Sequence, residues 1–521
     1  DVDMTELAFV IDKDEDVMWQ FLESGVAQLM ELGDVNTTDA FQRIKIHNKV
    51  NVSVGVSIDS GLMDLSLSTS EISLEDLLAI IGSYKNKKKY HRLRNGDFVN
   101  ITNKAIEELA DMFTAMRIAP KDFVKGKMQL PAYRAFYLDK MLEQNADLYT
   151  ERDSNFRRLI KEFKVINESD FEVPPSLAKV MRNYQEYGYK WLRTLAAYGF
   201  GGVLADDMGL GKTLQSIAVL AAAKETGEEG TSLIVCPASL IYNWQEEFTH
   251  FAPALKIILI VGTQKEREEK IAQLTGYDVA ITSYDLLKRD ISAYEGKTFN
   301  YEFIDEAQFI KNHTTAAAKS VKLIKSKRRF ALTGTPIENR LSELWSIFDY
   351  LMPGYLYEYS CFKKELEQPI VKSNDEAAAK RLKQLIAPFI LRRLKKDVLN
   401  ELPEKIEEVR IACFDAKQQA LYDGQVVKTL KLVQSQSEEE LSKSKIQILA
   451  ELMRLRQICC DPGLAFSNYE GASAKRELCL EMVQSAIEGE HKVLIFSQFK
   501  SMLELLAGDL QREDISYYTI N

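Results

Sequence analysis

The chain has 521 residues, too many for one ordinary hydrophobic core, so we expect about two to four domains. Hydrophobic residues make up 46% of the chain and charged residues 28%, a composition that excludes a disordered chain. No apolar run reaches membrane-spanning length, which argues against a membrane partner. The net charge of −10 argues against a simple basic nucleic-acid binder, although it does not exclude a local basic groove.

Residues 1–172 mix helical and strand patterns, which predicts an α+β domain. Apolar positions recur on one side of residues 16–32, as in a helix with one buried face. Residues 50–58 alternate like a strand, and an Asn-Gly pair within residues 91–101 predicts a hairpin. Nothing here has catalytic spacing, so a structural or regulatory role is the simplest expectation.

A β/α alternation begins after the prolines at 174 and 175 and defines a second predicted domain, residues 173–400. Five short β-rich runs predict buried strands at residues 233–236, 256–261, 279–284, 301–304 and 328–332. Helical segments at residues 213–224 and 239–249 lie between some of them. This rhythm predicts βαβ units and a parallel sheet covered on both faces.

Residues 401–521 form the third predicted part and begin in a helical stretch that spans residues 351–450. Residues 434–445 are so polar that we expect an exposed turn between helices. Residues 492–496 predict a new buried strand, and residues 501–512 an amphipathic helix. The six cysteines show no C-x-x-C spacing, so we expect reduced thiols in an intracellular protein and no cysteine metal site.

A phosphate-binding loop is predicted at Gly209, Gly211, Lys212 and Thr213, between a short apolar segment and a helix. Backbone N–H groups and a helix N-terminus converge on an anion at such a position. The lysine would reach the β- and γ-phosphates, and the threonine hydroxyl would hold Mg²⁺. The general pattern has glycine where Asp206 stands, and a chance Gly-Lys-Thr at a helix start is the alternative.

Asp305 and Glu306 close an apolar strand about ninety residues later. An aspartate at the carboxyl end of a strand can hold Mg²⁺, and the adjacent glutamate can orient and deprotonate a water. Alone, the two could be solvated acids beginning a loop. With Lys212 they predict the catalytic groups of an ATPase or GTPase.

From residue 177 to 521 the chain resembles the Swi/Snf-type DNA translocases of helicase superfamily two, through motifs in the expected order. Asp206 is the usual residue of that family's phosphate loop, whereas Gln308 replaces the usual histidine of its motif II. Residues 1–172 more loosely resemble the domain that precedes the motor in bacterial members. The segments that resemble the Q motif and motifs Ia, Ib, II, III and IV are residues 181–185, 236–244, 282–284, 305–308, 332–339 and 493–499.

The resemblance carries roles over to individual residues. It implies that ATP is bound by Arg182, Gln185, Asp207, Met208, Gly209, Leu210, Gly211, Lys212, Thr213 and Leu214, and Mg²⁺ by Thr213 and Asp305. It implies coupling residues at Gln308, Thr333, Gly334 and Thr335. It implies DNA contacts at Ser239, Tyr242, Asn243, Ser283, Tyr284, Ser497 and Gln498.

Simpler roles stay open for several of these residues. The Ser239 hydroxyl could cap a helix, and Thr333 and Thr335 could serve a tight turn. Trp244 is expected to pack in the core rather than to stack on a base. Arg392 and Arg393 could be surface charge, whereas the resemblance suggests a pair that braces two lobes.

The resemblance implies an α/β fold with RecA-like lobes, the first complete and the second truncated, and with helical protrusions. The implied function is ATP- and Mg²⁺-dependent translocation on double-stranded DNA that remodels protein–DNA complexes, RNA polymerase among the targets, without strand separation. A monomer at the bacterial nucleoid is expected, or a nuclear protein if the source is eukaryotic. The alternatives are a helicase or RNA-directed ATPase of the same superfamily, and a non-catalytic scaffold. Motifs V and VI should lie beyond Asn521, so we expect this chain to bind nucleotide and hydrolyse it slowly.

Overall fold

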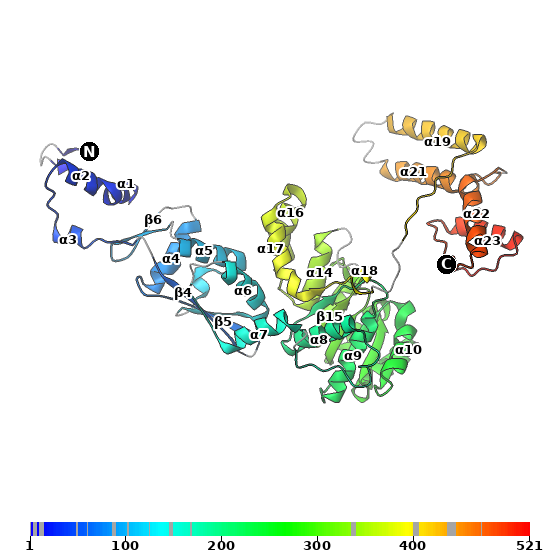
Figure 1. Cartoon of the computed structure of the whole chain (residues 1–521), viewed down its shortest axis with the longest axis horizontal. Coiled ribbons are helices and arrows are strands. Elements are labelled where there is room, and N and C mark those ends of the chain that lie inside the picture. The colour runs from blue at the N-terminus through cyan, green and yellow to red at the C-terminus, as the bar shows by residue number, and fades with distance from the viewer. Residues whose placement is uncertain are drawn as a thin grey trace. The chain divides into compact units, whose positions relative to one another are not determined.

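The computed structural model divides into two units, residues 1–402 and 403–521, which we describe separately (Figure 1). None of the helices that it describes has the length and apolar character that a bilayer crossing needs. The described residues are 2–3, 8–9, 15–47, 50–59, 61–85, 90–101, 104–123, 126–144, 149–166, 169–334, 340–399, 406–434, 444–469 and 471–520.

The N-terminal region combines small sheets with helices, as an α+β domain should. Its four-stranded sheet has the order β8-β5-β4-β9, and its three-stranded sheet the order β3-β7-β6. The strands are β1 Val2–Asp3, β2 Ala8–Phe9, β3 Ile46–His47, β4 Val52–Asp59, β5 Leu62–Thr69, β6 Tyr90–Arg92, β7 Phe98–Asn100, β8 Lys127–Pro131 and β9 Tyr149–Arg152. The helices are α1 Glu15–Gln20, η1 Phe21–Gly25, α2 Val26–Leu32, α3 Asp39–Gln42, α4 Leu74–Lys85, α5 Lys104–Met116, η2 Pro120–Asp122, η3 Ala132–Arg134, α6 Ala135–Gln144 and α7 Ser154–Lys164.

Two of the three elements predicted here are confirmed. Strand β4 alternates buried and half-buried residues, and β6 and β7 pair as a hairpin in which Gly96 has a φ of +95°. The predicted helix exists, but the prediction that one of its faces is buried is wrong. Only Trp19 is buried among its described residues, in a small cluster with Tyr90 and Phe98, whereas Met30 is 60% exposed. A cluster of three residues is too small to cover the whole apolar side of the helix.

Residues 173–399 form a lobe around a seven-stranded sheet in the order β12-β13-β11-β14-β15-β10-β16. All of its strand pairs are parallel, and every residue of β10, β11 and β13 is buried, so both faces are covered. The strands are β10 Gly202–Leu204, β11 Ser232–Cys236, β12 Ile257–Leu259, β13 Val279–Ser283, β14 Thr298–Ile304, β15 Lys325–Leu332 and β16 Ile390–Leu391. The α/β class and the five predicted strands are confirmed.

Helices connect these strands, with α8, α9 and α10 beside the sheet in Figure 1. The α-helices are α8 Asn183–Ala197, α9 Lys212–Glu225, α10 Ile241–Phe251, α11 Gln264–Ala272, α12 Tyr284–Asp290, α13 Ala316–Leu323, α14 Leu341–Leu351, α15 Tyr359–Phe362, α16 Gln368–Ser373, α17 Glu376–Ile386 and α18 Lys395–Val398. The short helices are η5 Ala238–Leu240, η6 Leu274–Gly276, η7 Ile291–Tyr294, η8 Ala307–Ile310, η9 Lys363–Glu367 and η10 Ala387–Phe389. The phosphate loop follows β10, and the predicted motifs Ia, Ib, II and III follow β11, β13, β14 and β15. In a parallel sheet these carboxyl ends share one edge, which is where ligands bind.

The second unit is helical over its described residues, with α19 Ala416–Gln434, α21 Lys445–Cys460, η11 Pro462–Leu464, α22 Ala474–Glu488 and α23 Lys500–Arg512. Helices α19 and α21 flank the predicted polar turn, whose residues 435–443 lie outside the described part of the chain. Helix α23 is confirmed. The strand predicted at residues 492–496 is wrong, because Leu494 and Phe496 are 83% and 88% exposed and no described strand of this unit pairs with them. An apolar run becomes a strand only when a neighbour accepts its backbone hydrogen bonds.

Candidate functional site

The phosphate loop turns sharply between β10 and α9 at two glycines. Gly209 and Gly211 have φ values of +82° and +73°, in the left-handed region that favours glycine. The ammonium of Lys212 donates to the backbone oxygen of Asp206 at 2.7 Å and to that of Asp207 at 3.4 Å. Burial lowers the pKa of Lys212, and the carboxylates of Asp206 and Asp305 oppose this effect. The lysine therefore occupies the centre of the loop, next to the unpaired N–H groups at the start of α9.

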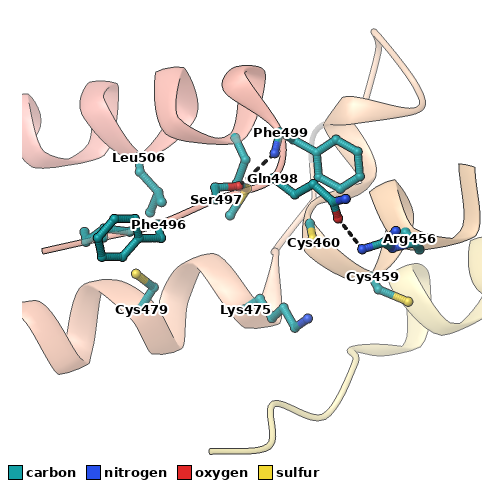
Figure 2. Close-up of a pocket in the computed structure, with 12 residues that line it drawn as sticks. Arg456, Cys459, Cys460, Lys475, Cys479, Phe496, Ser497, Gln498, Phe499 and Leu506 are labelled. Atoms are coloured by element: carbon teal, nitrogen blue, oxygen red, sulfur yellow. Dashed lines mark hydrogen bonds between the residues drawn. The ribbon is translucent and has the colours of Figure 1, made fainter. Parts of the chain in front are cut away.

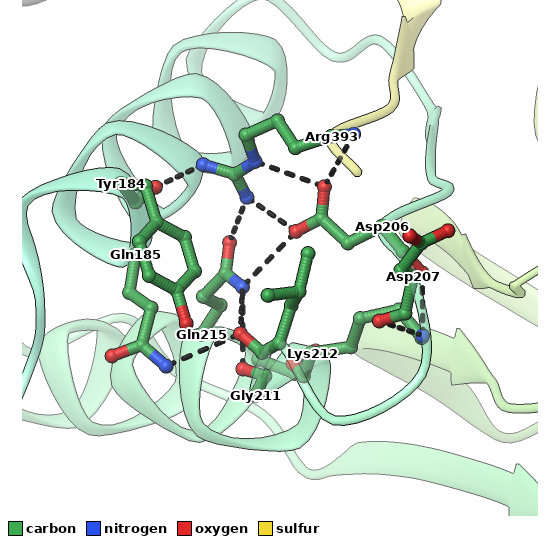
Figure 3. A network of polar contacts seen from close by, with 10 residues as sticks. Tyr184, Gln185, Asp206, Asp207, Gly211, Lys212, Gln215 and Arg393 are labelled. Carbon is green, nitrogen blue, oxygen red and sulfur yellow. Dashed lines mark hydrogen bonds and ion pairs between the residues drawn. The ribbon is translucent and has the colours of Figure 1, made fainter. Parts of the chain in front are cut away.

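The Asp206 carboxylate is fully buried and held by a fork of hydrogen bonds (Figure 3). Arg393 Nε donates to Asp206 Oδ1 at 2.9 Å, and its Nη2 donates to Asp206 Oδ2. Gln215 Nε2, from α9, donates to Asp206 Oδ2 at 3.3 Å. The residue that replaces the glycine of the general pattern is thus one partner of a buried ion pair.

The Q-motif residue Gln185 contacts this loop from the side (Figure 3). Its Oε1 accepts the backbone N–H of Arg182 at 2.9 Å, and its Nε2 donates to the backbone oxygen of Leu210 at 3.2 Å. A Cβ atom on Gly211 would lie 2.3 Å from Gln185 Nε2, so this close approach needs the glycine. The predicted adenine contact of Gln185 stays a prediction. Of the other predicted ATP ligands, the side chains of Leu210 and Leu214 are buried, that of Thr213 is half-buried and that of Met208 is exposed.

The motif II acids follow β14 at the same sheet edge. Asp305 Oδ2 accepts the indole N–H of Trp244 at 2.9 Å, and Asp305 Oδ1 accepts the backbone N–H of Glu306 at 2.9 Å. Burial raises the pKa of Asp305, which the indole N–H opposes by stabilising the carboxylate. Trp244 is 1% exposed, so the predicted core packing is confirmed, and its polar end fixes the orientation of Asp305.

Gln308 links Glu306 to the segment after β15. Gln308 Nε2 donates to Glu306 Oε2 at 2.7 Å, and Gln308 Oε1 accepts the Thr333 hydroxyl at 3.2 Å. Glu306 itself has a φ of +52°, an uncommon backbone conformation for a side chain of its size. A glutamine in place of the usual histidine therefore still joins motif II to motif III. Gly334 follows directly, and Thr335 lies outside the described residues.

The residues predicted to contact DNA fall into three groups. Ser239, Tyr242 and Asn243 are exposed at the start of α10, where helix α10 receives no side-chain cap from Ser239. Ser283 is buried and caps α12 by accepting the backbone N–H of Leu286 at 3.3 Å. The buried hydroxyl of Tyr284 donates to the backbone oxygen of Asp305 at 2.7 Å. This burial argues against DNA contacts by Ser283 and Tyr284, because their polar atoms serve the fold.

Ser497 and Gln498 lie in the second unit, where they line a cavity of about 400 Å³ (Figure 2). Gln498 Oε1 accepts a hydrogen bond from Arg456, and Ser497 Oγ accepts the backbone N–H of Phe499 at 3.2 Å. Cys459 and Cys460 border the same cavity as free thiols. These two predicted DNA contacts belong to residues 403–521, whereas the others belong to residues 1–402.

The sequence did not reveal the polar partners Arg393, Gln215 and Trp244. A signal for the first existed, since an aspartate at a buried glycine position needs a cation or donors nearby. Nothing local to residue 393 indicates that it is this cation, because it lies 187 positions away from Asp206.

The donor set fits a nucleotide with Mg²⁺ better than a metal held by protein alone. Within the described residues, no three His, Cys, Asp or Glu side chains are grouped as metal ligands. Asp305 and the Thr213 hydroxyl supply few oxygens, as is usual where Mg²⁺ is shared with phosphates. The loop meanwhile presents a half-buried ammonium and a helix N-terminus, both suited to phosphate oxygens.

Known proteins resemble this chain over both of its parts. The bacterial SNF2 helicase-associated family matches residues 2–174, and the SNF2-related domain matches residues 184–464. An ATP-dependent helicase of Mycoplasma pneumoniae is 32% identical over 94% of this chain and 46% of that protein. The ATP-dependent helicase/translocase YwqA of Bacillus subtilis is 38% identical over 70% of this chain and 41% of that protein. A solved SWI2/SNF2 ATPase core of Sulfolobus solfataricus in complex with dsDNA is 39% identical over 66% of this chain and 72% of that chain, with a TM-score of 0.43.

The chain thus spans about half the length of the curated relatives that it matches. The SNF2-related domain alone covers more than half of the 521 residues. The predicted family resemblance is confirmed: the chain belongs to the Swi/Snf-type family of ATP-dependent helicases and translocases.

Proposed function

We propose that the protein is an ATP-driven translocase on double-stranded DNA that remodels protein–DNA complexes without separating the strands. The observation that supports this proposal best is the contact between Trp244 and Asp305. The indole N–H of Trp244 holds Asp305 at the nucleotide site, while its neighbours Tyr242 and Asn243 are exposed polar residues at the start of α10. The groups that would sense nucleic acid are thus one and two residues from the side chain that contacts the nucleotide site.

Each side chain of the nucleotide site has a separate task in this proposal. Lys212 exchanges its bonds to the Asp206 and Asp207 oxygens for bonds to the β- and γ-phosphates, whose charge favours the protonated lysine. Thr213 and Asp305 would hold Mg²⁺, which would supply positive charge to neutralise the phosphates. Glu306 orients the attacking water and accepts its proton.

Coupling between the two sites uses the Gln308 link. When the Glu306 carboxylate turns toward a water, it must change its bond to Gln308, and that change reaches Thr333 through the other end of the same amide. The exposed residues Ser239, Tyr242 and Asn243 hold backbone phosphates, which positions the nucleic acid without reading its sequence. The name of the relative YwqA includes translocase, which agrees with movement along DNA. Displacement of DNA-bound proteins, RNA polymerase among them, by a monomer stays a prediction.

The decisive experiment measures ATP turnover with linear duplex DNA, single-stranded DNA or RNA, with Lys212→Ala as the inactive control. Nucleotide binding is measured separately, because the chain spans about half of its relatives. We expect nucleotide binding that depends on Lys212 and the strongest stimulation by duplex DNA, falling as salt rises. Stimulation mainly by RNA would instead favour an RNA-directed ATPase, and binding without any turnover would favour a scaffold.

A pair of matched tyrosines tests the DNA contact itself. Tyr242 and Tyr149 are 60% and 64% exposed, but only Tyr242 lies at the proposed DNA edge. Tyr242→Ala should lower stimulation by duplex DNA and leave DNA-free turnover unchanged, whereas Tyr149→Ala should change neither. Equal effects of the two substitutions would contradict the assignment.

A further inference from the structure

A short segment, residues 388–395, links the N-terminal region to the phosphate loop. The segment first forms the edge strand β16 and then passes along the loop as far as Lys395. The backbone N–H of Ala205 donates to the Leu391 oxygen at 2.7 Å, and that of Asp207 donates to the Arg393 oxygen at 3.0 Å. The backbone N–H of Lys395 donates to Asp207 Oδ2 at 3.0 Å. The entry to the loop is therefore hydrogen-bonded to the 388–395 segment residue by residue.

Arg393 ties this segment to two helices as well as to the loop (Figure 3). Besides its fork to Asp206, Nη2 donates to Gln215 Oε1 of α9 at 2.8 Å. Its Nη1 donates to the backbone oxygen of Tyr184 in α8, and the guanidinium lies 5.3 Å from the centre of that ring. A planar fork with several fixed donors makes these contacts together, which a lysine cannot do.

The start of the segment is packed by aromatic side chains of the N-terminal region and of the lobe. Phe389 is buried, and its ring centre lies 5.6 Å from that of Phe136 in α6 and 5.8 Å from that of Phe200. Phe136 in turn packs at 4.3 Å on Phe163 of α7. We call these four side chains the aromatic cluster. Such aromatic pairs, of which the two that Phe389 makes are edge-on, contribute beyond their buried area.

A second contact holds the same region of the lobe. Arg134 Nη1 donates to the Tyr357 hydroxyl at 3.2 Å, and Arg134 Nη2 donates to the backbone oxygen of Tyr355 at 3.4 Å. The Tyr355 ring packs at 5.1 Å on Phe389. The N-terminal region therefore contacts the start of the 388–395 segment directly through Phe136 and indirectly through Arg134 and Tyr355.

We propose that Arg393 is a positioning residue of the nucleotide site, and that the N-terminal region sets the geometry of the phosphate loop through the aromatic cluster and the 388–395 segment. This inference rests on the proposed nucleotide-binding function. A buried carboxylate in the loop can face inward only while Arg393 neutralises it, and Arg393 is placed by a segment whose other end the N-terminal region holds. Weaker packing in the aromatic cluster should therefore make the phosphate loop more mobile, although the cluster does not contact the loop.

Hydrogen exchange and nucleotide affinity test the proposal on the whole chain. Phe136→Ala removes the central ring of the cluster, and Phe136→Leu keeps much of its apolar volume. Phe21→Ala is the matched control, since Phe21 is also half-buried in the N-terminal region but packs on Phe41 instead. Arg393→Lys keeps the charge and removes the fork. Exchange is followed in residues 203–212 without nucleotide, and binding is measured with Mg·ADP.

We expect Phe136→Ala and Arg393→Lys to speed exchange in residues 203–212 and to weaken Mg·ADP binding by roughly 2- to 30-fold. Phe136→Leu should recover most of the affinity, and Phe21→Ala should match the unchanged protein. The proposal is overturned if Phe136→Ala leaves loop exchange unchanged, or if Phe21→Ala has the same effect. A parent protein that failed to bind Mg·ADP would overturn the proposed function instead, because the exchange measurement needs no nucleotide.

Discussion

Replacing Trp244 by phenylalanine removes one donor from the nucleotide site and keeps most of the packing. The indole N–H of Trp244 is the side-chain donor to Asp305 Oδ2, at 2.9 Å, and phenylalanine has nothing to replace it. The Asp305 carboxylate is already shifted toward its protonated form by burial. Without the indole, the pKa of Asp305 should rise further, and the carboxylate should be less well oriented to hold Mg²⁺.

The size of the effect follows from the kind of hydrogen bond. A bond to a charged group contributes about 1.5–3 kcal/mol, so losing it from the reacting state slows turnover by roughly 10- to 150-fold. The pH dependence has a definite sign. A carboxylate whose pKa is raised ionises only at higher pH, so the acidic limb of the pH–rate profile should move to higher pH.

Trp345→Phe is the matched control for this experiment. Trp345 is also buried, but its indole N–H donates to the backbone oxygen of Tyr357 at 3.0 Å rather than to a carboxylate of the site. ATP turnover is measured against pH and against Mg²⁺ concentration for both variants, with thermal unfolding to check the fold. The reasoning is refuted if Trp244→Phe leaves the acidic limb in place, or if Trp345→Phe moves it equally.

Three further predictions concern the coupling link and the buried charges of the lobe. Gln308→Ala deletes the 2.7 Å hydrogen bond to Glu306, so DNA-stimulated turnover should slow about tenfold or more while Mg·ADP binding is unchanged. A parallel loss of Mg·ADP binding would contradict this prediction. Burial raises the pKa of Glu302 from its ordinary value of 4.5 to about 7, so the folded form holds a proton that the unfolded chain loses. The free energy of unfolding should therefore fall by about 3 kcal/mol as pH rises from 4.5 to 7, and Glu302→Gln should abolish this slope in denaturant titrations. Asp290→Ala leaves the buried Arg267 without its two hydrogen bonds of 2.6 and 2.7 Å, which should lower the free energy of unfolding by about 3–5 kcal/mol. A change below about 1 kcal/mol would show that the ion pair is dispensable.

The sequence by itself determined the elements whose signals are local. Short β-rich, largely apolar runs predicted β11 and β13, because strands buried on both faces need few polar positions. The phosphate loop was readable from Gly209, Gly211 and Lys212, since its chemistry lies in consecutive backbone groups and the start of one helix. Asp305 and Glu306 were readable for the same reason, as acids at the end of a strand.

Local signals failed where burial depends on distant neighbours. The apolar residues 492–496 predicted a strand, yet Leu494 and Phe496 are exposed and pair with no described strand of their unit. The two-residue strand β16 was not predicted, because two residues show no periodicity; only the adjacent β10 makes them a strand.

Only the tertiary structure decided which polar atoms meet in the site. In the sequence, Asp206 and Arg393 are 187 residues apart, Trp244 and Asp305 are 61 residues apart, and Gln308 and Thr333 are 25 residues apart. Each of these side chains has an ordinary alternative as a surface or core residue, and the choice depends on which strand ends lie side by side in the sheet. The sequence therefore identified the groups that would handle phosphate, whereas the fold decided what holds those groups in place.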